Sequence, residues 1–167
     1  MTKPPSWPEY FTEMAELVST KSKDASTKVG AILVGPNNEI RSTGYNGFPR
    51  GVMEGIPVPA IARRSERPTK YLFTEHAERN AIYLAARHGA ATDGCTLYMN
   101  FWPIPCCDCT RGIIQAGIKR IVGRNVPFPG KGEQWKEHMQ ESLLMLQEAG
   151  VELFVVRNGK EEKFNVD

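Results

Sequence analysis

The chain carries two short motifs that constrain its fold more than any other feature: His76-Ala77-Glu78 and Pro105-Cys106-Cys107-Asp108-Cys109. Together they supply three nitrogen and sulfur ligands of the kind that zinc prefers, and one carboxylate that need not bind metal. Cys106 and Cys109 are three positions apart, so they share one face of the first turn if a helix begins near Pro105. A zinc site made from both motifs requires a fold that brings two helix starts together.

The chemistry of these residue types predicts a catalytic metal centre. The positive N-terminal end of a helix lowers the pKa of Cys106 and Cys109 and favours thiolates, which cancel the charge of Zn²⁺. A neutral imidazole from His76 completes three protein ligands. The fourth position is then open to a water that zinc makes acidic. Glu78 remains free to act as a general acid and base.

Each motif also has an interpretation without catalysis. A Cys-x-x-Cys pair by itself fits a redox dithiol, half of a structural zinc site or two buried thiols. The pair of motifs favours catalytic zinc, because His-x-Glu begins one helical pattern and Pro-Cys-x-x-Cys begins another after an apolar strand. A pairing of Cys107 with Cys109 is conceivable. We expect instead that Cys107 points away from the ligand face as a buried thiol.

Length, charge and cysteine use limit the class of protein. With 167 residues and 41% hydrophobic content, we expect a single domain over residues 1–167. The 21 basic and 19 acidic residues give a net charge of +2, too small to predict a nucleic-acid surface but compatible with a small anionic substrate. No leader and no run of about eighteen apolar residues is found, so we expect no membrane association. Crowded cysteines at 106–109 indicate metal binding in a reducing, cytoplasmic environment.

The first half of the chain predicts a helix and a hairpin. Ser6 to Glu9 is typical of a capping box, and apolar residues at helical spacing predict a helix over about 7–20. Short β-branched runs over 29–34 and 39–44, separated by a Gly-Pro-Asn-Asn turn, predict an antiparallel hairpin. Residues 45–73 form a long irregular connection that we expect to be functional, although a solvated loop remains an alternative for its basic residues Arg50, Arg63, Arg64, Arg67 and Lys70.

The second half alternates strands with helices. We expect a helix beginning at His76 and ended by Gly89 or Gly94, a strand over 95–99, a helix over 107–116, a strand over 118–122, a helix from about 135 to Gly150 and a last strand over 151–156. The strand–helix–strand order predicts a parallel final pair. Both motifs begin helices, which places them at the sheet edge where α/β proteins bind ligands. From Asn158 to residue 167 we expect a frayed tail.

With these motifs placed, nearly the whole chain resembles the deoxycytidylate (dCMP) deaminase family of the cytidine deaminase superfamily. The matching stretches are Trp7-Pro-Glu-Tyr-Phe11, Ser22-Lys-Asp24 with Val29-Gly-Ala31, Gly44-Tyr-Asn-Gly-Phe-Pro49, His76-Ala-Glu-x-Asn-Ala-Ile82, Pro105-Cys-x-x-Cys109 and Gln115-Ala-Gly-Ile-Lys119. The resemblance implies an α/β three-layer α/β/α sandwich with a five-stranded mixed sheet, and a homohexamer. It also implies conversion of dCMP to dUMP for the synthesis of dTMP, with activation by dCTP and inhibition by dTTP.

The resemblance also implies roles for individual residues. Glu78 is the expected catalytic residue, and His76, Cys106 and Cys109 are the expected ligands of one zinc ion per subunit. A nucleoside triphosphate effector could bring Mg²⁺ with it. The implied substrate-binding residues are Ser22, Lys23, Lys28, Asn46 and Ala77, with the first three near the phosphate and Asn46 against the sugar. The implied effector residues are Tyr45, Gly47, Phe48, Pro49 and Arg50.

Several alternatives stay open on sequence alone. The lysines could belong to a solvated turn, and Asn46 could be a turn-forming residue. Residues 100–104 make the approach to Pro105 about two residues longer than the family pattern, so their contact with the base and the role of Cys107 are open. Rival functions are deamination of dCTP, free cytidine, tRNA or single-stranded nucleic acid, or a non-catalytic zinc-stabilised binding module. The sequence does not decide between these substrates or effectors.

Overall fold

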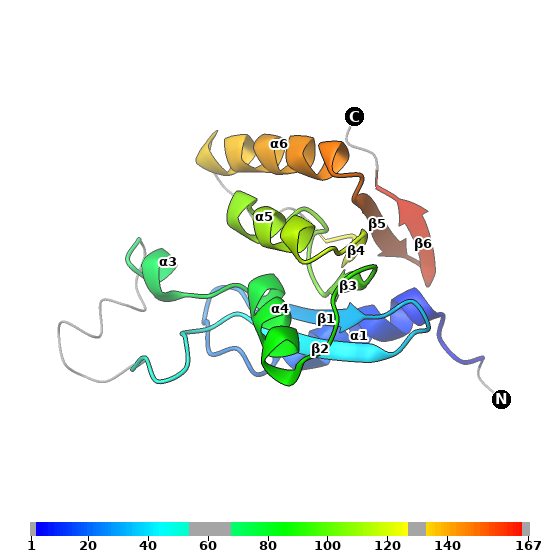
Figure 1. Ribbon diagram of the computed structural model, residues 1–167, viewed down its shortest axis with the longest axis horizontal. Helices are drawn as coiled ribbons and strands as arrows, with labels where there is room; N and C mark the ends of the chain where they lie inside the picture. The colour runs from blue at the N-terminus through cyan, green and yellow to red at the C-terminus, as the bar shows by residue number, and fades with distance from the viewer. Residues whose placement is uncertain (1–2, 54–67, 127–132, 165–167) are drawn as a thin grey trace.

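A computed structural model describes residues 3–53, 68–126 and 133–164 of the chain (Figure 1). The strands form one six-stranded mixed sheet in the order β2-β1-β3-β4-β5-β6. The strands β3, β4 and β5 run parallel, whereas β1 is antiparallel to both β2 and β3. The elements are α1 (Trp7–Ser19), β1 (Gly30–Val34), β2 (Ile40–Tyr45), α3 (Lys70–Phe73), α4 (Ala77–His88), β3 (Thr96–Met99), α5 (Cys107–Gln115), β4 (Arg120–Arg124), α6 (Glu133–Glu148), β5 (Glu152–Arg157) and β6 (Lys160–Lys163).

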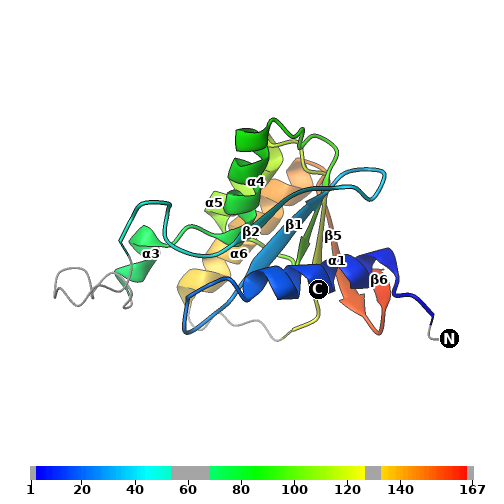
Figure 2. The ribbon, with the colours of Figure 1, turned by 90° about the horizontal axis from the view of Figure 1, so that it is seen from below.

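Helices cover both faces of this sheet, which confirms the predicted three-layer sandwich. Figure 2 shows α1 on one face and α4, α5 and α6 on the other. The alternation of side chains along β1 explains the division: Ala31 and Leu33 belong to the core beneath α4 and α5, whereas Ile32 and Val34 pack with Phe11 of α1. All five positions of β1 are buried, as expected for a strand covered on both faces.

Two glycines let the helices approach the sheet closely. A Cβ at Gly30 would lie 2.0 Å from the Ala15 carbonyl oxygen of α1. On the opposite face, a Cβ at Gly44 would lie 2.1 Å from the Ala77 carbonyl oxygen and 2.4 Å from the Ala81 nitrogen. The small side chains of Ala77 and Ala81, both fully buried, complete this contact. The first turn of α4 is therefore seated directly on β2.

The predicted elements are all present, with boundaries that differ by up to two residues. The Ser6 hydroxyl accepts a hydrogen bond from the Glu9 N–H and caps α1, as the capping pattern indicates. The largest displacement is β4, which we predicted over 118–122. Gly117 adopts a left-handed conformation (φ +73°), and the Ile118 N–H still bonds back to Ile113 at the end of α5, so the strand begins two residues later.

The C-terminal tail is the clearest error of the sequence analysis, because residues 160–163 form a sixth strand instead of a frayed end. Asn158 and Gly159 have φ values of 49° and 72°, the conformation of a two-residue hairpin turn. The β6 strand pairs antiparallel with β5 and ends where the Phe164 N–H donates to the Leu153 carbonyl. Its charged sequence Lys-Glu-Glu-Lys suits an edge strand. Residues 165–167 lie outside the described part of the chain.

The long connection after β2 is described at its two ends. Residues 54–67, which include Arg63, Arg64 and Arg67, are outside the described residues. The short helix α3 follows them and lies at the end of the molecule opposite the two termini (Figure 1). Among the described helices, none combines the length and apolar character needed to span a bilayer.

Candidate active site

The three expected metal ligands sit at the first turns of two neighbouring helices. His76 is the N-cap residue of α4, Cys106 is the N-cap residue of α5, and neither side chain caps its own helix. The backbone of each ligand is nevertheless held by the helix, because the carbonyls of His76 and Cys106 accept from the N–H groups of Asn80 and Thr110 at 2.9 Å. Both ligand side chains are therefore positioned by helical backbone while remaining available for metal.

The distances between these side chains fit zinc. His76 Nδ1 lies 3.5 Å from Cys106 Sγ and 3.4 Å from Cys109 Sγ. A tetrahedral site with Zn–N of about 2.1 Å and Zn–S of about 2.3 Å separates these atoms by about 3.5 Å. Among the described residues, His76, Cys106 and Cys109 are the group of potential ligands whose atoms converge within 4.8 Å.

Hydrogen bonds among the ligand side chains shift their pKa values in opposite directions. The Cys109 thiol donates to Cys106, and this bond, together with His76, lowers the pKa of Cys106 to about 4 against the opposing effect of burial. The hydrogen bond between His76 and Cys106 raises the pKa of His76 to about 9, against the opposing effect of burial. A thiolate and an imidazolium thus face each other near neutral pH. Metal binding would release protons from this group.

Glu78 lies beside the ligand cluster in the first turn of α4. Glu78 is 7% exposed, and this burial raises the pKa of its carboxyl group. The carboxylate is not part of the converging ligand group. A buried carboxyl with a raised pKa next to a metal site has the properties of a general acid and base.

A cavity of about 470 Å³ opens from this metal end. His76, Ala77, Glu78 and Cys106 line one part of it, and a substrate contact of Ala77 stays a prediction. Apolar and aromatic side chains form much of the wall: Val29, Met99, Phe101, Trp102, Ile104 and Met139. The cavity therefore offers a flat apolar surface next to a polar reaction centre, which suits an aromatic base.

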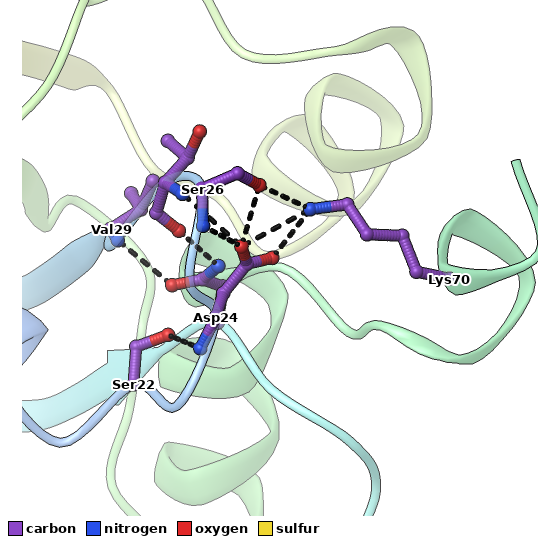
Figure 3. A network of polar contacts seen from close by, with 7 residues as sticks. Ser22, Asp24, Ser26, Val29 and Lys70 are labelled. Carbon is purple, nitrogen blue, oxygen red and sulfur yellow. Dashed lines mark hydrogen bonds and ion pairs between the residues drawn. The ribbon is translucent and has the colours of Figure 1, made fainter. Parts of the chain in front are cut away.

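The opposite part of the cavity is a rim of charged and hydroxyl side chains (Figure 3). Lys70 reaches from α3 to the Asp24 carboxylate at 2.9 and 3.1 Å and to the Ser26 hydroxyl at 2.6 Å. Asp24 Oδ1 also accepts from the Ser26 N–H at 2.8 Å and the Thr27 N–H at 3.1 Å. Burial raises the pKa of Asp24, but the hydrogen bonds from Lys70, Ser26 and Thr27 outweigh it and lower the pKa to about 2.

Asn46 lies between the two ends and lines the cavity. Its Oδ1 accepts from the Val29 N–H at 2.8 Å, and its Nδ2 donates to the Thr27 carbonyl at 2.9 Å. Asn46 is 7% exposed, so these bonds satisfy a buried carboxamide and hold the start of β1. The structure therefore supports a positioning role for Asn46, while a contact with sugar stays a prediction.

The residues predicted to meet phosphate are near the rim but do not line the cavity. Ser22 is 2% exposed and its hydroxyl accepts from the Asp24 N–H, whereas Lys23 and Lys28 are exposed. The cavity is lined instead by Asp24, Ser26, Thr27 and Lys70. The turn could have been recognised from Asp24-x-Ser26, in which an Asp side chain accepts from the N–H two residues on. Lys70 has no comparable local signal, because its partners are about 45 residues away.

The predicted effector residues divide between a second cavity and the surface. Gly47 and Phe48 line a smaller cavity of about 100 Å³, together with Lys23, Asp24, Ala25, Lys70 and Thr74. Tyr45, Pro49 and Arg50 are exposed and do not line it. Asp24, Lys70 and Thr74 belong to both cavities.

Residues 100–104, whose role the sequence left open, connect β3 to the metal motif. The Asn100 Oδ1 accepts from the Gly30 N–H at 2.8 Å, which anchors the segment to the sheet. Phe101, Trp102 and Ile104 line the cavity.

Cys107 points away from the ligands as predicted, but it is half-buried, and its thiol donates to the His138 carbonyl of α6 at 3.1 Å.

Known proteins resemble the chain over most of its length. Residues 5–124 match the model of the cytidine and deoxycytidylate deaminase zinc-binding region. An uncharacterised deaminase of the luxG 3′ region of Aliivibrio fischeri is 40% identical over 151 residues, which cover 88% of this chain and 91% of that protein. The deoxycytidylate deaminase of Mus musculus is 40% identical over 116 residues, which cover 70% of this chain and 63% of the mouse protein.

A solved structure agrees with the fold. The dCMP deaminase of cyanophage S-TIM5, crystallised with dCMP and dUMP, is 31% identical to this chain and superimposes with a TM-score of 0.68. The match covers 93% of this chain and 100% of the cyanophage chain. The converging His, Cys and Cys ligands, the buried Glu78 and the matched region lead to one conclusion: this chain belongs to the cytidine and deoxycytidylate deaminase family of zinc-binding enzymes.

Proposed function

We propose that the chain hydrolyses dCMP to dUMP and ammonia. The observation that carries this proposal is one cavity with a His, Cys and Cys cluster beside Glu78 at one end and Lys70 with two hydroxyl groups at the other. A pyrimidine fits against the apolar wall, and a phosphate would accept from Lys70, which pairs with Asp24, and from the hydroxyl groups of Ser26 and Thr27. The likeness to the cyanophage protein crystallised with dCMP and dUMP supports the same substrate.

The proposed mechanism assigns the proton transfers to Glu78. Zinc held by His76, Cys106 and Cys109 would supply an activated water. Glu78 takes a proton from this water and delivers it to N3 of cytosine, which makes C4 electrophilic. The water oxygen forms the new bond to C4, and Glu78 then carries the second proton to the departing amine, so that the C4–N bond breaks and ammonia leaves. One water is consumed and one ammonia is released for each uracil formed.

The proposed substrate contacts come from side chains that line the cavity and from two lysines near it. Lys70 and the hydroxyl groups of Ser26 and Thr27 line the cavity, while Lys23 and Lys28 add positive charge around it. Asn46 and Ala77 would face the sugar and the base. Charge-assisted hydrogen bonds to phosphate are stronger than neutral ones, so they would discriminate dCMP from an uncharged nucleoside.

Uracil formation from a set of substrates tests the proposal. The purified zinc-loaded protein is incubated with dCMP, deoxycytidine, cytidine, dCTP and a cytosine-containing single strand. We expect the highest kcat/KM for dCMP and much weaker turnover of the nucleosides. Preference for the single strand or for dCTP would assign a different substrate, and zinc binding without any turnover would favour a binding module.

We further propose regulation of a homohexamer by nucleotides, with dCTP activating and dTTP inhibiting, each carrying Mg²⁺. The small cavity supports this because Gly47 and Phe48 line it and it shares Lys70 with the large cavity. We expect a sigmoidal dCMP response that dCTP makes hyperbolic, with Arg50→Ala weakening this effect. A hyperbolic response of a monomeric protein, unchanged by either triphosphate, would contradict the proposal.

We also propose a cytoplasmic location, which fits the need to keep Cys106 and Cys109 reduced.

A further inference from the structure

Glu75, the residue immediately before the metal ligand His76, is held by contacts on its backbone and its side chain. Its N–H donates to the Gly47 carbonyl at 2.8 Å, and its own carbonyl accepts from the Gly47 N–H at 3.0 Å. Its Oε1 accepts from the His76 N–H at 3.0 Å. The same oxygen lies 2.6 Å from Arg79 Nε. The backbone that carries the His76 ring is therefore tied to the turn after β2 and to a charge one helical turn along α4.

Arg79 belongs to α4, and its side chain extends toward α5, so it lies between the two helices that carry the metal ligands. Its side chain is 27% exposed, and its buried Nε atom makes the ion-pair contact with Glu75 without the geometry of a hydrogen bond. A Cβ placed at Gly112 of α5 would lie 3.7 Å from the Arg79 Cγ. Burial lowers the pKa of Arg79, but the interactions with Cys109 and Glu75 outweigh it and raise the pKa. The guanidinium thus pairs with the Glu75 carboxylate just before α4, while the stem of the side chain reaches toward α5.

We infer that Glu75 and Arg79 are positioning residues of the metal centre: Arg79 orients the Glu75 carboxylate, and Glu75 fixes the His76 backbone so that its ring meets Cys106 and Cys109. The inference rests on the proposed metal site, and the dCMP substrate is not needed for it. His76 is an N-cap residue with an extended backbone (φ −82°, ψ 154°), so the regular helix does not determine its conformation alone. The Glu75 carboxylate supplies the missing restraint.

A second acidic–basic pair provides a matched comparison. Asp108 and Arg111 form an ion pair in the first turn of α5, which also carries metal ligands, but their side chains are 58% and 61% exposed. Exposed ion pairs on a helix surface contribute little to stability. If the Glu75–Arg79 pair were of this kind, its loss would leave the metal centre unchanged.

Metal binding by purified variants tests the inference. Zinc dissociation constants are measured by competition with a chromogenic chelator, and the geometry is followed by the visible absorption of the Co²⁺-substituted protein. We expect Arg79→Met and Glu75→Gln to weaken zinc binding about 10- to 100-fold, the range found when residues that orient metal ligands are replaced. Arg79→Lys should restore most of the affinity, and Arg111→Met should bind zinc like the wild type. Unchanged affinity and an unchanged Co²⁺ spectrum in Arg79→Met would overturn the inference.

Two further readouts separate positioning from folding and from the proposed function. Thermal unfolding of the metal-free variants should match that of the wild type, whereas an equal loss of stability with and without zinc would mean that the pair only supports the fold. A wild type that binds zinc tightly but does not deaminate dCMP would reject the proposed substrate. The zinc affinities of the variants would then still decide whether Glu75 and Arg79 position the metal centre. A wild type that binds no zinc would reject both.

Discussion

The two ends of the large cavity are built in different ways. At the metal end, His76, Glu78 and Cys106 belong to the first turns of α4 and α5, two helices packed on the sheet. At the rim, a loop carrying Asp24 meets the short helix α3 through the side chain of Lys70. The backbone thus determines the metal end, whereas an ion pair between distant segments determines the rim.

Two carboxylates show the electrostatic side of this difference. Burial raises the pKa of Glu78, against the smaller opposing effects of His76 and Arg79. Hydrogen bonds lower the pKa of Asp24 to about 2, despite the opposing effect of burial. The metal end therefore holds a carboxyl ready to exchange protons, and the rim holds one that stays ionised. This difference supports our proposal that the first end carries out the chemistry and the second recognises a charged substrate group.

The largest effect is expected at the metal end from Cys109→Ala. Removing one of three ligands should abolish tight zinc binding and lower turnover to background, because the activated water is lost with the metal. Metal content by atomic emission and the rate of dUMP formation check this. Cys107→Ala is the control and should retain both. Normal zinc content in Cys109→Ala would place the metal elsewhere.

The second effect separates proton transfer from metal binding. Glu78→Gln should keep zinc but lower kcat by about 10²- to 10⁴-fold, the usual contribution of a general acid and base. Metal analysis and steady-state kinetics are made on the same sample. If zinc disappears along with activity, Glu78 is a ligand, and the division of roles at the metal end is wrong.

The third effect tests the rim. Lys70→Met should raise KM for dCMP about 10- to 100-fold, because hydrogen bonds to charged groups contribute about 1.5–3 kcal/mol. The weak turnover of deoxycytidine should change little, since the nucleoside has no phosphate. The double variant Lys23→Ala/Lys28→Ala, whose side chains do not line the cavity, should have a smaller effect on dCMP. Equal losses on both substrates in Lys70→Met would make Lys70 a structural residue.

The fourth effect concerns the stability of the rim at low pH. The folded pKa of Asp24 is about 2, below its usual value of 3.8, so the ionised group stabilises the fold above about pH 4. This contribution, about 1–2 kcal/mol after allowance for solvent screening, is lost as the pH falls from about 4 through about 2. Urea unfolding of the wild type and Asp24→Asn should therefore differ at pH 7 and converge near pH 2. A constant difference would contradict the assignment.

The smallest effect on activity is expected far from both ends. Gly159→Ala places a side chain at φ 72° and should destabilise the β5–β6 hairpin by about 1–2 kcal/mol. Urea unfolding measures the loss, and kcat/KM for dCMP should stay within about twofold. Phe164 directly follows β6, and its ring centroid lies 5.1 Å from that of Trp102, which lines the cavity. A clear fall in kcat/KM would show that β6 supports the cavity through this contact.

Local sequence patterns predicted the metal end almost completely. The spacing of Cys106 and Cys109 is set by one helical turn, and His76 and Glu78 lie at fixed positions of another, so secondary structure carries the geometry. Apolar periodicity predicted the individual helices and strands, whereas the three-layer arrangement was expected from the resemblance to the dCMP deaminase family. The tail was mispredicted because its charged composition was given more importance than the Asn158-Gly159 turn signal, which is itself local.

The sequence by itself predicted the group of ligands that converges in the structure, the carboxyl that we propose as general base and the helices that present them, because each depends on residues within about one helical turn. Only the tertiary structure decided which lysine meets the cavity, since Lys70 lies far along the chain from Asp24 and Ser26, and no periodicity relates them. It also decided that Gly47 holds Glu75 beside His76. Contacts of this kind arise when the sheet and helices have packed, and packing is a property of the whole chain.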